Sequence, residues 1–406
     1  MITRRIISLE MRNPPRPLTR RPLRGRHPLP LAGEGTRGAV PPPLPLAREG
    51  GTRRASDGRV RGTLHTCAAI AALVLLALPA RAAAPALASV TPELVAAAQK
   101  EGRVVFYTSI ELRLAERMGQ EFEARYPGIA VQVERSGAER IFQRVAQEEE
   151  SNVHAADVVE SSDVGHALAW KRAGLLAPFV PADVARWPED ARDPDGCFAA
   201  DRATLSVIGY NTRLVKPEEA PKSFADLLQP QWAGKIVKAH PGYSGTIMTA
   251  TFEQSQALGW DYFARLARQK VMQVQSATDP PKKLALGERP VMADGSEYVM
   301  FGLQASGNPV AIVYPVEGTP LVVGSAAVMK AAPHPNAARL FVSFVFSRDG
   351  QQLMSDAGGL RSFHPDVREQ PGRTPLAAIK LLKADPVEQE RAGDDVKRKY
   401  AEYFGT

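Results

Sequence analysis

Residues 103–133 have the sequence RVVFYTSIELRLAERMGQEFEARYPGIAVQV, and the order of patterns in this stretch decides the fold class. Residues 103–108 are a short β-rich run, residues 111–126 repeat apolar side chains at helical spacing, and residues 129–133 are β-rich again. A strand, a helix and a second strand in this order predict a βαβ unit, in which the two strands are parallel. The stretch therefore predicts an α/β protein.

The alternation of strands and helices continues on both sides of this unit. A helix is predicted over residues 91–100, further elements follow to residue 173, and a second alternating run occupies residues 235–314. Two longer β-rich runs, at 204–211 and 321–329, are suited to cross between two lobes. We predict a two-lobed α/β fold in which each lobe is a mostly parallel sheet flanked by helices, and two crossover strands join the lobes. The predicted division assigns residues 89–205 with 321–406 to lobe 1 and residues 206–320 to lobe 2.

The N-terminal part of the chain differs in composition from the rest. Residues 1–62 contain ten prolines and an imperfect repeat, so they predict either a disordered leader or upstream sequence translated from a mis-called start codon. Residues 63–88 contain a 14-residue apolar run from Cys67 to Ala80, followed by small-residue sites, which is typical of a secretory signal peptide. An uncleaved membrane anchor is the alternative. We expect an exported, periplasmic protein that begins near Ser89.

The basic charge of the chain lies in this N-terminal part. Residues 1–88 hold fifteen Arg and four acidic residues, so the remainder has 51 − 15 = 36 basic and 44 − 4 = 40 acidic residues, a net charge of −4. A basic patch for nucleic acid therefore loses its main support, and we expect no nucleic-acid partner. Cys197 is then its single cysteine, which makes no internal disulfide and is expected to be a half-buried thiol, with a reactive thiol as the alternative.

Several segments in order resemble the extracellular solute-binding proteins of ABC importers. They are similar in particular to the ferric-ion-binding group and its thiamine, phosphonate and sugar-phosphate relatives. The matching segments are VVFYTS (104–109), FEARYPGI (122–129), ADV (156–158), AGLLAP (173–178), WAGKI (232–236), GSAAVM (324–329) and GQQL (350–353). The resemblance covers about residues 90–370. It implies two α/β lobes joined by crossing strands, a small solute closed between them, delivery to an ABC permease in the inner membrane, and a monomer.

Polar loops at strand ends and helix starts are the candidate solute contacts. Loops of this kind present free N–H groups and positive helix ends to an anion. The alternative for each loop is plain helix capping. The candidates are Thr108 and Ser109, Ser136 and Gly137, Ser161 and Ser162, and the loop Tyr243, Ser244, Gly245 and Thr246. They predict a small oxyanionic solute such as a phosphonate, a sugar phosphate or a carboxylate.

The resemblance also leaves iron open as the bound solute. The family's ferric ligands align with Glu111, with Ser162 and with the region of Glu297 and Tyr298, so most of that ligand set is replaced. If Fe³⁺ is the solute, Glu111, Glu297 and Tyr298 are the candidate ligands. Otherwise Glu297 and Tyr298 are predicted solute contacts, and a cleft carboxylate favours a solute with an amine or several hydroxyls. Arg361 is either an anion clamp or one partner of a surface ion pair.

No motif for catalysis or for a resident cofactor occurs in the predicted mature chain. Residues 89–406 contain no nucleophile elbow, no His-Glu-x-x-His, no Cys-x-x-Cys and no Gly-x-Gly-x-x-Gly. We therefore expect a binding protein without a cofactor and without turnover. An exported α/β hydrolase-type enzyme is the alternative from another class, because a triad needs no sequence proximity.

Overall fold

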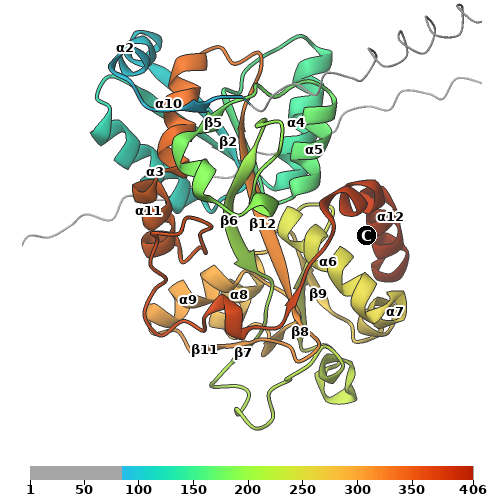
Figure 1. Cartoon of the computed structure of the whole chain (residues 1–406). Coiled ribbons are helices and arrows are strands. Elements are labelled where there is room, and N and C mark those ends of the chain that lie inside the picture. Colours follow the sequence, from blue (N-terminus) through green and yellow to red (C-terminus); the bar gives the residue numbers. More distant parts are fainter. Residues whose placement is uncertain (1–84, 406) are drawn as a thin grey trace, which may run out of the picture. The chain divides into compact units, whose positions relative to one another are not determined.

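The computed structural model describes residues 85–405, all of which belong to one compact unit (Figure 1). The predictions for residues 1–62 and for residues 63–84 lie outside the described residues. Within residues 85–405, no helix combines the length and the apolar character needed to span a bilayer. Leu87 and Ala88, the end of the predicted signal segment, form strand β1 (Leu87–Ala88), which pairs with β5 (Val180–Pro181).

The first large sheet contains the βαβ unit that the sequence predicted. Strand β2 (Arg103–Thr108), helix α3 (Leu112–Arg125) and strand β3 (Ala130–Arg135) follow each other, and β2 and β3 are parallel, with Arg103 opposite Ala130. The sheet has six strands in the order β13-β12-β4-β2-β3, with β6 paired to β12. The other strands are β4 (Val158–Ser161), β6 (Ala199–Leu205), β12 (Thr319–Val328) and β13 (Leu381–Leu382).

The second large sheet has five strands in the order β11-β7-β10-β8-β9. They are β7 (Ile208–Asn211), β8 (Ile236–Ala239), β9 (Met272–Val274), β10 (Val291–Met292) and β11 (Val310–Val313). Strand β8 is parallel to both β9 and β10, whereas β7 is antiparallel to β10 and β11. We call the first sheet with its helices lobe 1 and the second sheet with its helices lobe 2; the residue limits predicted for the lobes stay predictions.

Helices cover both sheets. The helices of lobe 1 are α2 (Pro92–Glu101), α3, α4 (Ala138–Glu150), α5 (Val164–Arg172), α10 (Pro335–Phe346) and α11 (Arg348–Gly358). Those of lobe 2 are α6 (Gly245–Leu258), α7 (Trp260–Arg268), α8 (Asp279–Ala285) and α9 (Glu297–Ala305), and the chain ends in α12 (Pro386–Phe404). Short 3-10 turns occupy Ala182–Arg186, Glu189–Ala191, Asp226–Leu228, Pro230–Trp232 and Leu376–Ala378.

Strands β6 and β12 run side by side between the elements of the two sheets (Figure 1). They pair antiparallel from Leu321 opposite Leu205 to Ala326 opposite Ala199, with an irregularity between Gly324 and Ser325. The β-rich run predicted over 204–211 breaks between β6 and β7, so the chain passes from one sheet to the other at this point.

Each lobe has its own apolar core. In lobe 1, Phe106 and Phe122 pack on Phe341 of α10, with ring centroids 5.0 and 5.1 Å apart. In lobe 2, Phe224 and Phe263 belong to a separate buried cluster. These two clusters share no residue, and a third cluster joins Leu205 of β6 to Val237 and Met292 of lobe 2.

Candidate functional site

A small cavity lies where the strand ends of lobe 1 meet the loops of lobe 2. The space open to the centre of a water molecule is about 20 Å³, room for roughly one or two waters. The lining residues are Ser109, Arg135, Gly137, Ala138, Ser162, Arg202, Tyr243, Ser244, Thr246, Ser276, Ala277, Thr278, Ser296 and Tyr298. Ser109, Gly137, Ser162, Tyr243, Ser244, Thr246 and Tyr298 were among the candidates from the sequence.

Helices α4, α6 and α9 begin at this cavity. Gly137 precedes α4 and makes no side-chain capping bond, and Ser296 precedes α9 without one. Ser244 caps α6 by accepting a hydrogen bond from the backbone N–H of Ile247 at 3.4 Å. The first N–H groups of a helix have no partner within the helix, so these ends bring partial positive charge and free donors to the cavity.

Two glycines allow the loops of the lobes to touch. A Cβ at Gly137 would lie 2.5 Å from the carbonyl oxygen of Tyr243, and one at Gly245 would lie 2.8 Å from Ser162 Oγ and 2.9 Å from Ala138 Cβ. These distances are shorter than van der Waals contact, so side chains at either position would hold the lobes apart. Gly245 therefore shapes the site without lining the cavity.

Arg202, on β6, is a cavity residue that the sequence reasoning missed. Its guanidinium is 3% exposed; Nη2 donates to Glu160 Oε1 and, at 3.2 Å, to Ser109 Oγ. Its Nε atom makes no hydrogen bond within the described residues. The sequence feature that could have revealed Arg202 is the pair Asp201-Arg202 inside a β-rich run, because charged side chains buried in a strand require partners.

Glu160, at the end of β4, organises the floor of the site. Besides Arg202, it accepts hydrogen bonds from Thr108 Oγ1 and the Ser109 N–H, both at 2.7 Å, and from the Ile110 N–H at 3.2 Å. Thr108 is fully buried and donates to Glu160, so its hydroxyl is directed into the floor and not into the cavity. The sequence reasoning had placed Thr108 at the solute.

Two carboxyl groups lie beside Arg202. Glu160 is hydrogen-bonded to its guanidinium, and Asp201 Oδ2 lies 3.8 Å from its Nε atom. Asp201 is fully buried, neither of its carboxylate oxygens makes a hydrogen bond within the described residues, and burial together with the charge of Glu160 raises its pKa well above the usual value. Arg135, whose Nε donates to the carbonyl of Ile110 at 3.2 Å, adds a second guanidinium to the lining. Burial raises the pKa of Tyr298, so its phenol is neutral at pH 7.

Two of the candidate serines lie beside the cavity but do not line it. Ser161 is fully buried, and its Oγ pairs with His166 Nδ1 at 2.9 Å and accepts from the Asp163 N–H at 3.0 Å. The Ser136 N–H donates to the carbonyl of Thr108 at 3.2 Å, continuing the pairing of β3 with β2. These serines hold the strand ends in place, as capping and turn residues do.

Glu297 is not a cleft carboxylate. It is fully buried and accepts hydrogen bonds from Arg361 at 2.8 and 3.1 Å, from Arg373 at 2.7 Å and from Tyr314 Oη at 2.7 Å. Burial raises the pKa of Glu297, but the two arginines outweigh burial and hold the pKa below its usual value. The argument for an amine-bearing solute therefore loses its basis. Arg361 is 2% exposed, so it is neither an anion clamp facing the cavity nor a partner in a surface ion pair.

The candidate iron ligands do not share one site. Glu111 caps α3 by accepting from the Arg113 N–H at 2.9 Å, Glu297 is enclosed by arginines, and of the three only Tyr298 lines the cavity. Over residues 85–405 there is no group of three or more His, Cys, Asp or Glu side chains placed to hold a metal ion.

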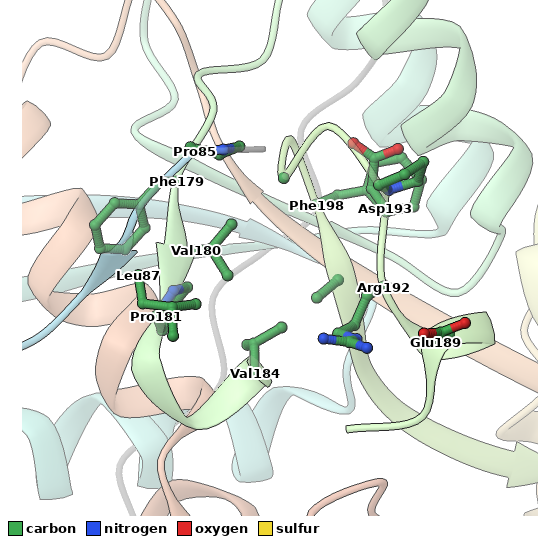
Figure 2. Close-up of a pocket in the computed structure, with 13 residues that line it drawn as sticks. Pro85, Leu87, Phe179, Val180, Pro181, Val184, Glu189, Arg192, Asp193 and Phe198 are labelled. Atoms are coloured by element: carbon green, nitrogen blue, oxygen red, sulfur yellow. The ribbon is translucent and has the colours of Figure 1, made fainter. Parts of the chain in front are cut away.

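A larger cavity, of about 520 Å³, lies in lobe 1 away from the strand ends (Figure 2). Figure 2 shows Leu87, Val180 and Pro181 on one side of it and Glu189 and Arg192 on the other. Cys197 lies nearby; burial raises the pKa of its thiol, which disfavours the reactive thiolate.

Comparisons with known proteins agree with the two-lobed architecture. A family described as bacterial extracellular solute-binding protein matches residues 155–377. An uncharacterized protein of Haemophilus influenzae is 28% identical over 63% of this chain and 76% of its own length. Iron uptake protein A2 of Synechocystis is 26% identical over 64% of this chain and 78% of its own length. Among solved structures, the periplasmic binding protein AfuA from Actinobacillus pleuropneumoniae, with fructose-6-phosphate bound, is 25% identical, covers 75% of this chain and 99% of its own, and has a TM-score of 0.69.

Proposed function

The chain belongs to the bacterial extracellular solute-binding proteins, and from that premise we propose that it captures a small oxyanion between its lobes for an ABC transporter. A relative from Sinorhizobium fredii is named a probable ABC transporter periplasmic-binding protein, which supports a periplasmic location and a permease of such a transporter as the partner. We propose the same location and partner for this chain, as a monomer exported by a signal peptide. In this proposal the solute is the only group that the cavity binds, and the protein has no resident cofactor.

The observation that supports an oxyanionic solute is the convergence of hydrogen-bond donors on the cavity. The N-termini of α4, α6 and α9 meet the guanidiniums of Arg135 and Arg202 there, and hydroxyl groups supply most of the remaining polar lining. None of the described residues that line the cavity carries a carboxylate. A site with positive helix ends, two guanidiniums and no negative side chain favours an anion with several oxygen atoms.

Capture follows from closure of the lobes. In the closed arrangement the cavity has room for only about one or two waters, so a solute enters when the lobes part and occupies space that they then share. Closure surrounds the anion with donors from both lobes and removes it from water, which strengthens each hydrogen bond. Reopening at the permease releases it.

Within the oxyanion class we propose a phosphonate, a sugar phosphate or a carboxylate. The fructose-6-phosphate bound to AfuA supports a sugar phosphate. The iron alternative has support from the name of the Synechocystis relative. Against it, two guanidiniums repel a bare cation, so Fe³⁺ would require an accompanying anion in this cavity.

The lining also disfavours an enzyme. A hydroxyl nucleophile needs a general base within hydrogen-bond reach. The ionisable side chains that line the cavity are Arg and Tyr alone among the described residues, and neither takes a proton from serine at neutral pH. We therefore propose binding without turnover.

A thermal-shift screen of the purified exported protein tests this proposal. The panel contains sugar phosphates, phosphonates, carboxylates, polyamines, and Fe³⁺ with and without carbonate. A solute at 100 times its Kd stabilises the folded protein by about 2.7 kcal/mol, so its melting temperature rises measurably. A shift with organic oxyanions supports the proposal. A shift with iron alone, or with polyamines alone, overturns it.

A further inference from the structure

The C-terminal helix α12 contacts both lobes. The sequence had placed residues 321–406 in lobe 1, yet α12 packs on α5 of lobe 1 and on α6 and α7 of lobe 2. Figure 1 shows it beside α6 and α7, on the flank of the molecule where the lobes meet. The two sets of contacts differ in chemistry.

The contacts of α12 with lobe 2 are apolar and buried. Val396, 2% exposed, packs with Met248 and Phe252 of α6. Tyr400 is fully buried, and its Oη donates to Gln273 at 2.9 Å. The Tyr400 ring also lies 5.1 Å from the ammonium of Lys238, which forms a buried ion pair with Asp294. Lifting α12 off lobe 2 would bring this buried pair into contact with water, so the helix is an integral part of lobe 2.

The contacts of α12 with lobe 1 are polar and partly exposed. Glu390 forms two hydrogen bonds with Arg172 of α5, at 2.8 and 2.9 Å, and the Arg172 side chain is 62% exposed. Lys397 donates to Glu139 of α4 at 2.7 Å. Burial raises the pKa of Glu139, but His166 and Lys397 outweigh burial and the pKa is about 2. The exposed ion pair between Arg172 and Glu390 opens at little cost in water. The buried Glu139 keeps His166 as a partner when Lys397 leaves, so this side can separate.

Gln389 joins both sides through one amide group. Its Nε2 donates to Asp163 Oδ1 of lobe 1 at 2.7 Å and to Thr249 Oγ1 of lobe 2 at 2.8 Å, and the side chain is 3% exposed. Asp163 follows the cavity residue Ser162, and Thr249 lies one turn beyond the cavity residue Thr246, so Gln389 connects the N-terminal ends of α5 and α6 close to the cavity.

We propose that α12 is a strap that moves with lobe 2 and fastens to α4 and α5 of lobe 1 when the lobes close. Its polar contacts form only in the closed arrangement, so they add to the stability of that arrangement independently of the solute. Affinity for the solute then depends on the strap as well as on the cavity. The inference rests on closure of the lobes, not on the identity of the solute.

An engineered disulfide between the strap and lobe 1 tests the proposal without any solute. A Cβ at Gly165 of α5 would lie 3.2 Å from Glu390 Cβ, a few tenths of an ångström shorter than is usual in disulfides. The test protein is the exported chain with Gly165→Cys, Glu390→Cys and Cys197→Ser, purified in oxidised and reduced forms, with the disulfide verified by mass. The control carries Gly165→Cys and Cys197→Ser only. The measurement is the radius of gyration from small-angle X-ray scattering.

Glu390→Cys removes the ion pair with Arg172, so the proposal requires the reduced test protein to open, and the oxidised form to have a smaller radius of gyration than the reduced form. Dithiothreitol should restore the larger radius. The control protein should keep one radius under both conditions. Equal radii for the oxidised and reduced test protein would mean that fastening α12 to lobe 1 does not restrain the lobes, and would overturn the strap. Failure of the disulfide to form would place Glu390 away from Gly165 and would also overturn it. Either result leaves the proposed oxyanion untouched, because no solute is present.

Discussion

Arg135 and Arg202 differ in what surrounds them, although both line the cavity. Arg202 is compensated by the fully buried Glu160, whereas the Nε atom of Arg135 donates to a backbone carbonyl. Removal of Arg202 would leave Glu160 buried without a counter-charge, which mixes stability with binding. Arg135 is therefore the better residue for measuring the electrostatic part of solute binding.

We predict that Arg135→Met weakens binding of the solute found in the screen by about tenfold or more. A hydrogen bond to a charged group contributes about 1.5–3 kcal/mol, and each 1.4 kcal/mol is about tenfold in Kd. Isothermal titration calorimetry measures the change. Arg192→Met, which changes the larger cavity of lobe 1, is the matched control and should keep the parent Kd. If Arg192→Met weakened binding and Arg135→Met did not, the solute would bind in the larger cavity.

We predict that substitutions of Glu160 and Arg202 have coupled effects on stability. Glu160→Gln removes the carboxylate that is hydrogen-bonded to Arg202, a residue 3% exposed, leaves only the more distant Asp201 beside it, and should lower the free energy of unfolding by up to about 3–5 kcal/mol. Arg202→Met should also be destabilising, because it leaves the buried Glu160 carboxylate without its guanidinium partner. Because each single variant leaves one buried charge, the double variant should be less destabilised than the sum of the two. Urea unfolding measures all three, and simple additivity would contradict the coupling.

At the scale of elements, the start of α6 controls how closely the lobes approach. Gly245→Ala adds a Cβ 2.8 Å from Ser162 Oγ and 2.9 Å from Ala138 Cβ, both in lobe 1. Opening of the lobes relieves this contact without disturbing either core. We therefore predict weaker solute binding at nearly unchanged stability, measured by calorimetry and thermal unfolding.

Gly302→Ala is the matched control for Gly245→Ala. Gly302 lies inside α9, and a Cβ there would have no neighbour within 4 Å. Alanine in place of glycine in a helix stabilises by about 0.5–1 kcal/mol, so this variant should be slightly more stable and bind as the parent does. Parent-like binding by Gly245→Ala would show that the lobes close without contact at α6.

At the scale of the whole molecule, one carboxyl links α6 of lobe 2 to the crossover strand β12. Glu253 is 3% exposed and accepts from the Leu321 N–H at 3.1 Å, and burial raises its pKa to about 9. Between about pH 5 and pH 9 the folded protein holds a proton on Glu253 that the unfolded chain has released. This group therefore makes stability fall as pH rises through that window, with a slope of at most about 1.4 kcal/mol per pH unit.

We predict that Glu253→Gln makes the stability of the protein less dependent on pH between pH 5 and pH 9. Glutamine is neutral throughout, so the variant loses the proton linkage of Glu253 and keeps that of every other group. Urea unfolding at several pH values measures the slope. Glu116→Gln, at an exposed position on α3, is the control and should keep the parent slope. An unchanged slope in Glu253→Gln would contradict the raised pKa.

The sequence by itself determined the α/β fold class, the βαβ unit at 103–133 and the polar strand-end loops, because hydrophobic periodicity and capping residues act over a few neighbouring positions. It also proposed Ser109, Gly137, Ser162, Tyr243, Ser244 and Thr246 as solute contacts, because strand ends of a parallel sheet meet at one edge. These residues line the cavity, and their contact with a solute stays a prediction.

Only the tertiary structure decided which charged and polar side chains meet. The partners Glu160 and Arg202 are 42 residues apart, Glu297 and Arg361 are 64 apart, and Asp163 and Gln389 are 226 apart. No local pattern specifies such pairs, so Glu297 was placed in the cleft and Arg202 was missed. The position of α12 across both lobes follows from the same cause, because the surfaces that bury its apolar face and bind its polar face come from distant parts of the chain.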